Sequence, residues 1–143
     1  MKLILIMGNS GSGKTTFAEK LVHEISGRGY PVSWLNADDV RKEFDDWDFS
    51  DEGRDRAACR MRVLAEQLDQ EYVVVDMISP TERTREIVKP DFIVFMNTIK
   101  EGRFNDTNAI FEAPQCHLVD VCFDDFPKID DAKEVVDKIS FLC

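Results

Sequence analysis

The sequence predicts an α/β fold in which a five-stranded parallel sheet lies between two layers of helices. Short apolar segments alternate with amphipathic segments of helical spacing along the 143 residues, and this order favours a parallel sheet with right-handed crossovers. The first apolar segment runs directly into a glycine-rich loop, and a helical pattern follows that loop. The length is that of one domain, which we expect to span residues 1–143.

The first strand and the first helix are the most clearly marked elements. Leu3 to Met7 form a continuous apolar run that ends in glycine, as expected for a parallel strand buried on both faces. The apolar residues that follow the loop recur at helical spacing, at Phe17, Ala18, Leu21, Val22 and Ile25. Gly27 and Gly29 are expected to end this helix.

The remaining elements are expected in alternation. Further strands are predicted at Val32–Leu35, Tyr72–Val75, Phe92–Met96 and Leu118–Phe123. Helices are predicted near Asp38, from about Asp51 to Gln70, from Pro80 to before Pro90, and near the C-terminal end, where one stripe holds Ile129, Ala132, Val135, Val136 and Ile139. The one long irregular stretch, Asn97–Gln115, is expected to be functional, because loops of that length are uncommon in compact domains.

Composition restricts the class of protein. The formal net charge is −10, which disfavours long nucleic acids as partners because they require clustered lysine and arginine. A local basic pocket inside an acidic shell remains compatible with this charge. No segment approaches the ~20 apolar residues that span a bilayer, and the N-terminal apolar run is too short for an export signal. We therefore expect a cytoplasmic protein with no membrane partner.

The four cysteines are Cys59, Cys116, Cys122 and Cys143, and they form neither a CxxC pair nor a disulfide-framework spacing. We expect reduced, mostly buried thiols. A metal cluster of Cys116, His117 and Cys122 is disfavoured, because structural zinc sites use four ligands at regular spacing.

The glycine-rich loop is the most specific motif. Gly8-Asn9-Ser10-Gly11-Ser12-Gly13-Lys14-Thr15 matches the pattern G-x-x-x-x-G-K-[ST] without a mismatch, so we expect a P-loop NTPase-type fold. Its glycines let main-chain N–H groups point at phosphates, and the N-terminus of the next helix adds partial positive charge. We expect this loop and Thr16 to bind the phosphates of ATP, Lys14 to act catalytically, and Thr15 to ligate Mg²⁺.

Charged residues follow the second and third strands, where the carboxyl ends of parallel strands form a ligand crevice. Asp38 could orient Mg²⁺ or accept the proton of an attacking hydroxyl group, and Arg41 could hold an anionic acceptor. The alternative is that Asp38 only caps a helix and Arg41 is solvated. Asp76 could act on Mg²⁺ through water, as a Walker-B acid does, or could simply end its strand.

Several further segments carry a resemblance to the adenylylsulfate kinase (APS kinase) family over nearly the whole chain. That family reads roughly GLSGSGKST, LDGDNVR, FSxxDRxENIRR, ISP, FTGIDxPYEAP and LVID, and this chain has GNSGSGKTT, LNADDVR, FSDEGRDRAACR, MISP, FNDTNAIFEAP and HLVD in the same order. The resemblance implies transfer of a phosphoryl group from ATP, with Mg²⁺, to the 3′-hydroxyl of adenosine 5′-phosphosulfate. It also implies a small-molecule nucleotide substrate and, as is common among relatives, a homodimer.

The resemblance also implies an acceptor site. The matching residues are Asp38, Arg41, Phe49, Arg54, Ile78, Ser79 and Phe104. Asp38 matches the second aspartate of the DGD motif, a metal-orienting or base carboxylate, and Arg41 matches the arginine that holds the acceptor. Phe49 and Phe104 would sandwich the acceptor adenine, with burial in the core as the alternative for both.

This chain departs from the family pattern at several of these positions. Asn36 and Ala37 stand where the family has aspartate and glycine. Gly53 replaces an aspartate, and Ala57 replaces an asparagine that contacts the acceptor.

The segment before FNDTN is also much shorter than in the family, where it carries a basic lid. Here it is reduced to Asn97–Arg103, in which Lys100 and Arg103 could substitute for the basic residues of the lid. A shortened lid is expected to exclude water less well and so to weaken phosphoryl transfer.

Three alternatives remain open from the sequence. The segments LNADDVRKE and SPTER also resemble 5′-hydroxyl polynucleotide kinases, although the net charge and the FNDTNAIFEAP segment disfavour that interpretation. A small-molecule O-kinase of the same fold and a non-catalytic nucleotide-binding regulator are the other two.

Overall fold

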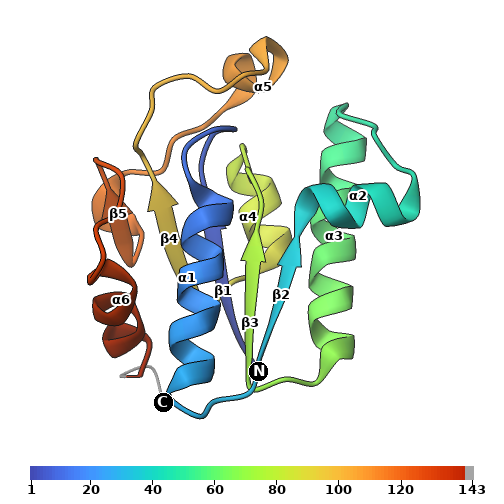
Figure 1. Cartoon of the computed structure of the whole chain (residues 1–143). Coiled ribbons are helices and arrows are strands. Elements are labelled where there is room, and N and C mark those ends of the chain that lie inside the picture. Colours follow the sequence, from blue (N-terminus) through green and yellow to red (C-terminus); the bar gives the residue numbers. More distant parts are fainter. Residues whose placement is uncertain (141–143) are drawn as a thin grey trace.

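One parallel sheet lies at the centre of the molecule (Figure 1). The structure, a computed structural model, describes residues 1–140. The sheet contains β1 (Lys2–Met7), β2 (Val32–Asn36), β3 (Tyr72–Asp76), β4 (Phe92–Met96) and β5 (Val121–Phe123). All four pairings are parallel and the strand order is β2-β3-β1-β4-β5. The predicted five-stranded parallel sheet is therefore confirmed.

Helices cover both faces of the sheet, as the three-layer prediction requires. On one face lie α1 (Lys14–Gly27) and α6 (Asp131–Ser140), and on the other lie α3 (Asp51–Leu68) and α4 (Glu82–Val88). The short helices α2 (Ala37–Phe44) and α5 (Asn105–Ile110) lie near the carboxyl ends of the strands (Figure 1).

The covering of both faces of the sheet explains why β1 is apolar from Leu3 to Met7. Ile4 and Ile6 belong to the core shared with α1 and α6, whereas Leu3, Leu5 and Met7 belong to the core shared with α3 and α4. Successive side chains of a strand point to opposite faces, so a strand covered by helices on both sides needs apolar residues at every position.

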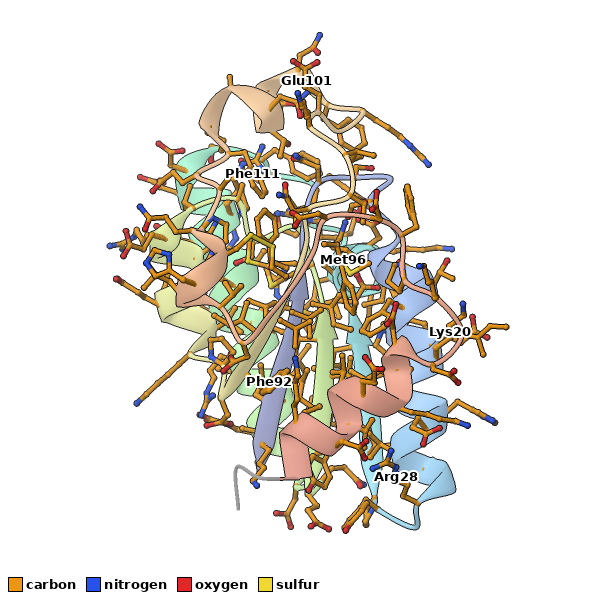
Figure 2. All side chains as sticks on the ribbon, turned by 90° about the vertical axis from the view of Figure 1, so that its left-hand side faces the viewer. Lys20, Arg28, Phe92, Met96, Glu101 and Phe111 are labelled. Atoms are coloured by element: carbon orange, nitrogen blue, oxygen red, sulfur yellow. A yellow bond between two sulfur atoms is a disulfide. The ribbon has the colours of Figure 1, made fainter. Side chains whose placement is uncertain are left out.

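Contacts between α1 and α6 stabilise the helical layer that these two helices form on one face of the sheet. Ala132, Val135, Val136 and Ile139 of α6 are buried, as the predicted stripe requires. At the end of α1, Arg28 Nη1 donates a hydrogen bond to Asp137 Oδ1 at 2.7 Å, and Figure 2 shows Arg28 beside α6.

Ile129, the first residue of the predicted stripe, is not part of α6. Its side chain is 87% exposed, and the helix begins two residues later. The reason is a turn, in which the Asp131 carboxylate accepts a hydrogen bond from the main-chain N–H of Lys128.

The last strand also begins later than the sequence suggested. The chain forms a 3₁₀ turn at Cys116–Leu118, and β5 starts only at Val121. Asp120 explains the difference, because its main-chain N–H and its carboxylate both bond to the main chain of Ile93, and strand pairing starts from that point.

Two other boundaries differ from the prediction. Helix α4 starts at Glu82 rather than at Pro80, because the Thr81 hydroxyl caps it by accepting from Thr84 N. The stretch predicted as wholly irregular, Asn97–Gln115, contains α5.

The prediction of reduced thiols is wrong for Cys116 and Cys122 and holds for Cys59, whereas the prediction of burial is wrong for Cys59. Cys116 and Cys122 form a disulfide, and Cys59 is free and exposed. Cys143 lies outside the described residues. Within residues 1–140, no helix has both the length and the apolar character needed to cross a bilayer.

Candidate active site

A cavity of about 610 Å³ opens at the carboxyl ends of the strands. Most of the predicted site residues line it, namely Ser10, Gly11, Gly13, Lys14, Thr15, Thr16, Asp38, Arg41, Phe49, Arg54, Asp76, Ile78, Ser79 and Phe104. Gly8, Asn9 and Ser12 do not line it but build the loop behind it. The fold thus brings the predicted phosphate-binding and acceptor-binding residues to one place.

The cavity is basic although the chain is acidic. Its lining includes four arginines and two lysines but only two aspartates, whereas the net charge of the chain is −10. A local concentration of cationic groups of this kind suits a small polyanion.

The conformation of the P-loop, residues 8–15, suits a polyphosphate. A Cβ atom on Gly8 would lie 2.7 Å from Met96 O and 2.8 Å from Ser12 Oγ, so no larger residue fits there. Gly13 has φ 93°, which also favours glycine. Ser12 Oγ is buried behind the cavity without a hydrogen-bond partner among the described residues.

Lys14 reaches back into the loop from the first turn of α1. Its side chain is 9% exposed, and Nζ donates a hydrogen bond to Asn9 O at 3.0 Å. Burial lowers the pKa of Lys14, and the carboxylates of Asp76 and Asp38 oppose that shift. The ammonium group is therefore placed where anionic oxygens would compensate its lost hydration.

The end of β3 adds a carboxylate to this loop. Asp76 Oδ2 accepts from Thr15 Oγ1 at 2.9 Å and from Asn36 Nδ2 at 2.8 Å, and Asp76 is 2% exposed. Burial raises the pKa of Asp76, and the hydrogen bonds from Thr15 and Asn36 oppose this rise. A hydroxyl group beside a carboxylate provides the oxygen ligands that Mg²⁺ prefers, so the residues present fit the metal.

Asp38 does not cap α2, so that alternative is wrong. The N-cap of α2 is Asn36, whose Oδ1 accepts from Asp39 N at 3.0 Å. The Asp38 side chain is exposed and lines the cavity instead. It is therefore free to approach a substrate hydroxyl group or a metal-bound water.

The two phenylalanines predicted to stack on adenine are not core residues. Phe49 is 45% exposed and Phe104 is 53% exposed, and both line the cavity. The core-packing alternative is therefore wrong for both. Large exposed aromatic rings in a cavity are typical of base-stacking positions.

Two arginines hold the turn that carries Phe49. Arg41 Nη1 donates to the main-chain oxygens of Asp46 at 3.0 Å and Asp48 at 3.1 Å, and its Cζ lies 4.4 Å from the Phe49 ring centroid. Arg54 Nε donates to Phe49 O at 2.9 Å. Arg41 is 7% exposed, so the alternative of a solvated helix residue is wrong. Both arginines therefore fix the position of Phe49 in the cavity wall.

Ser79 forms part of the cavity wall, and its hydroxyl group is paired within the protein rather than free to bind a ligand. It is 1% exposed with φ 48°, and its Oγ lies 3.2 Å from Thr84 Oγ1. Ile78 precedes it in the lining.

The shortened lid lies directly on the P-loop. Thr98 Oγ1 donates to Ser12 O at 2.7 Å, and a Cβ on Gly102 would lie 3.0 Å from Ser10 N. Of its two basic residues, Arg103 lines the cavity and contributes to the lowered pKa of Lys14. Lys100 does not line the cavity, so only Arg103 is placed to substitute for the basic residues of a longer lid.

Two cavity residues were missed by sequence reasoning. Phe126 lies beside Gly13, where a Cβ would be 3.3 Å from its ring, and no motif marks it. Arg60 follows Arg54 and Ala57 at helical spacing on α3, a signal that could have found it. Its Nη1 is buried without a hydrogen-bond partner among the described residues, while Nη2 bonds to Asp46 at 3.0 Å.

The P-loop lies at the carboxyl edge of a parallel sheet and faces acidic, basic and aromatic groups in one cavity. This arrangement defines the fold as that of a P-loop kinase. Comparison with known proteins narrows this class. The family profile described as adenylylsulphate kinase matches residues 1–110, so the chain belongs to that family.

Curated relatives agree with this assignment. A probable adenylyl-sulfate kinase of Pyrococcus abyssi is 35% identical over 65% of this chain and 55% of the relative. A probable adenylyl-sulfate kinase of Bacillus subtilis is 30% identical over 88% of this chain and 59% of the relative. The chain thus spans about half the length of the curated relatives it matches.

The APS kinase of Mycobacterium tuberculosis, solved in complex with AMPPNP and APS, superposes with a TM-score of 0.81 at 23% identity, covering 97% of each chain. Shikimate kinase from Acinetobacter baumannii superposes with a TM-score of 0.59 at 17% identity, covering 99% of this chain and 94% of the other. At these identities the superpositions show the fold alone.

Proposed function

We propose that this chain transfers the γ-phosphoryl group of ATP to the 3′-hydroxyl of adenosine 5′-phosphosulfate. The observation that carries the proposal is the shared cavity, in which the P-loop faces Phe49, Phe104 and the arginines that match the family's acceptor motifs. Membership of the adenylylsulphate kinase family supports the same substrates.

On the donor side, the P-loop amides and Lys14 would bind the β- and γ-phosphates of ATP. Mg²⁺, held by Thr15 with Asp38 and Asp76 acting through water, would supply further neutralisation of the phosphate charge. Arg103 lies over Gly11 and would add a cation on the lid side, where a Cβ of Gly11 would be 3.9 Å from its Nε.

On the acceptor side, the adenine ring would stack between Phe49 and Phe104, and stacking of this kind contributes ~1–3 kcal/mol per base. Arg41 lies against Phe49 and would face the anionic phosphosulfate. The 3′-hydroxyl oxygen would attack the γ-phosphorus, its proton would pass to the Asp38 carboxylate, and ADP would leave.

The test is incubation of the protein with ATP, Mg²⁺ and adenylylsulfate, with separation of the nucleotide products. Formation of 3′-phosphoadenylylsulfate with equimolar ADP supports the proposal. Parallel reactions contain a 5′-hydroxyl oligonucleotide or a panel of small alcohols. Faster labelling of either of these would overturn the acceptor assignment, and ATP binding without transfer to any acceptor would indicate a regulator.

A further inference from the structure

Arg103 is the one residue of the lid, Asn97–Arg103, that lines the cavity. A Cβ on Gly11 would lie 3.9 Å from Arg103 Nε, so the guanidinium group lies over the P-loop. The Arg103 side chain is exposed, and none of the ion pairs among residues 1–140 includes it. Its place over the P-loop therefore depends on how the main chain around it is held.

The main chain next to Arg103 is held by a single side chain. Gly102 N donates a hydrogen bond to Asn108 Oδ1 at 2.8 Å, and Asn108 Nδ2 donates one to Gly102 O at 3.1 Å. A side-chain amide offers an acceptor and a donor side by side. Asn108 therefore pairs with both main-chain polar groups of Gly102, which an apolar residue at position 108 could not do.

The paired glycine lies against the phosphate-binding loop. A Cβ on Gly102 would lie 3.0 Å from Ser10 N and 3.1 Å from Asn9 Cβ. Both distances are shorter than the ~3.5–4.0 Å of an ordinary contact between carbon atoms, so the main chain of the lid approaches the P-loop closely at Gly102. A side chain that holds Gly102 at this point also sets the distance between Arg103 and the P-loop.

The helix that carries Asn108 is itself fixed to the body of the protein. Asn108 follows Thr107 on α5, and Thr107 is 4% exposed. Arg54 Nη2, on α3, donates to Thr107 Oγ1 at 3.2 Å, and Arg54 is 7% exposed. Hydrogen bonds from a charged donor are stronger than neutral ones. Helix α5 is therefore a firm support for the lid beyond the carboxyl ends of the strands (Figure 1).

The other contacts between the lid and the P-loop lie farther from Arg103. Thr98 bonds to the P-loop, but it lies at the start of the lid. The hydrogen bond from Asn9 Nδ2 to Lys100 O is long, at 3.5 Å. The two bonds of Asn108 are the ones that hold the residue next to Arg103.

We propose that Asn108 is a positioning residue, which holds the end of the lid against the P-loop and so places the Arg103 guanidinium group beside the phosphates of a bound nucleotide. Arg103 makes the contact with the phosphates, and Asn108 acts through it. A lid held in this way is organised for binding before the nucleotide arrives. The inference rests on the proposed binding of ATP phosphates by the P-loop, and it does not depend on which acceptor is phosphorylated.

The experiment is a double-mutant cycle read out by nucleotide binding. The affinity for AMPPNP with Mg²⁺ is measured by calorimetry for the wild type, Asn108→Ala, Arg103→Met and the double variant. Asn105→Ala is the matched control, because Asn105 is an exposed asparagine on the same helix that does not line the cavity. Hydrogen exchange of a peptide that contains Gly102 reports how firmly the lid is held, and thermal melting reports folding.

We expect Arg103→Met to lower the affinity for AMPPNP about 10-fold or more, as loss of a charge-assisted hydrogen bond does. Asn108→Ala should lower it by a similar factor and should speed exchange of the Gly102 amide, whose acceptor is lost. The affinity of the double variant should lie within about threefold of that of Arg103→Met, because both changes remove the same contact. Asn105→Ala should match the wild type in every measurement.

Wild-type affinity in Asn108→Ala would overturn the proposal, as would unchanged exchange of the Gly102 amide. Effects that multiply in the double variant would overturn it too, because Asn108 would then act by a route other than Arg103. If Asn108→Ala does not fold, Asn108→Leu, which has a similar volume and forms neither hydrogen bond, takes its place in the cycle.

The same measurements separate this inference from the proposed function. A wild type that binds no AMPPNP would overturn both. A wild type that binds magnesium AMPPNP and shows the expected cycle, but does not phosphorylate adenylylsulfate, would refute the proposed function and leave the role of Asn108 supported.

Discussion

Lys14 is buried inside the P-loop, and this position explains both its lowered pKa and its expected role. Its ammonium group lies 3.0 Å from Asn9 O, close to where the leaving oxygen of ATP would develop charge. We predict that Lys14→Ala lowers kcat by at least ~10²–10³, the typical loss on removing one donor to the transition state. Steady-state assays with adenylylsulfate measure this, with exposed Lys42→Ala as the control. Near-wild-type transfer by Lys14→Ala would contradict the P-loop assignment.

Arg60 has a buried donor that no described group satisfies, and its side chain lines the cavity near Arg41 and Arg54, in the part proposed to bind the acceptor. A hydrogen bond from a charged group typically contributes about 1.5–3 kcal/mol. We therefore predict that Arg60→Met raises the KM for adenylylsulfate by ~10–100-fold and leaves the KM for ATP unchanged.

The matched control for Arg60→Met is Arg83→Met. Arg83 is a solvent-exposed arginine that pairs with Asp55 outside this cavity. An unchanged KM for adenylylsulfate in Arg60→Met, or an equal effect on the KM for ATP, would show that Arg60 does not contact the acceptor.

The departure at Gly53 has a steric reason that lies in the turn before α3. A Cβ on Gly53 would lie 2.7 Å from the main-chain carbon of Asp48 and closer still to its oxygen. We predict that Gly53→Ala destabilises the protein by about 1–3 kcal/mol, as overpacking does, and raises the KM for adenylylsulfate because the turn carries Phe49. Urea unfolding and kinetics measure the two effects. Gly27→Ala, where the added methyl meets nothing, is the control.

An ion-pair cluster fixes the same turn to α3. Asp46 accepts hydrogen bonds from Arg56 and Arg60, and these lower the pKa of Asp46 below its ordinary value of 3.8. A carboxyl group with a lowered pKa in the folded state contributes stability above its unfolded pKa and loses it as the pH falls through the folded value.

We therefore predict a pH-dependent effect of Asp46→Asn. The difference in urea midpoint from the wild type should be constant from about pH 7 to about pH 5 and should shrink below about pH 4. Asp45→Asn, one residue earlier, is the control. A difference that stays constant down to the acid transition would show that the ionised carboxylate contributes no stability.

Periodicity predicted the buried elements well and their ends less well. The strands β1 to β4 and the stripes of α1 and α6 were visible because burial on one or both faces leaves a regular apolar pattern. The start of β5 was not, because Asp120 sets it by bonding to Ile93 on a distant strand. The disulfide between Cys116 and Cys122 also depends on which loops the fold brings together.

The candidate site shows the same difference between features that a local pattern marks and features that depend on the fold. The P-loop motif was visible in full, because it fixes residue types at consecutive positions. Phe126 and the contact between Asn36 and Asp76 could not be predicted, since they depend on strand order and on loops far apart in the sequence. No periodicity or motif encodes such contacts.

Residues beyond the family match complete the core. The match ends at residue 110, yet β5 and α6 follow it, and α6 buries Val135, Val136 and Ile139 against the layer of α1. We predict that a chain truncated after Ile110 does not fold, because the apolar side of α1 and the edge of β4 would be exposed. Circular dichroism and thermal melting would test this, with the full chain as the reference. A cooperative transition in the truncated chain would contradict the prediction.

The basic cavity lies in an acidic chain, and this contrast in charge bears on the size of the anions that can bind. A single nucleotide can place all of its phosphates among the cavity's arginines and lysines. A strand of nucleic acid would also have to bring its flanking phosphates to a chain of net charge −10, which disfavours its binding. We therefore expect the charge distribution to favour small anions over polymers, before any contact with a base or a sugar.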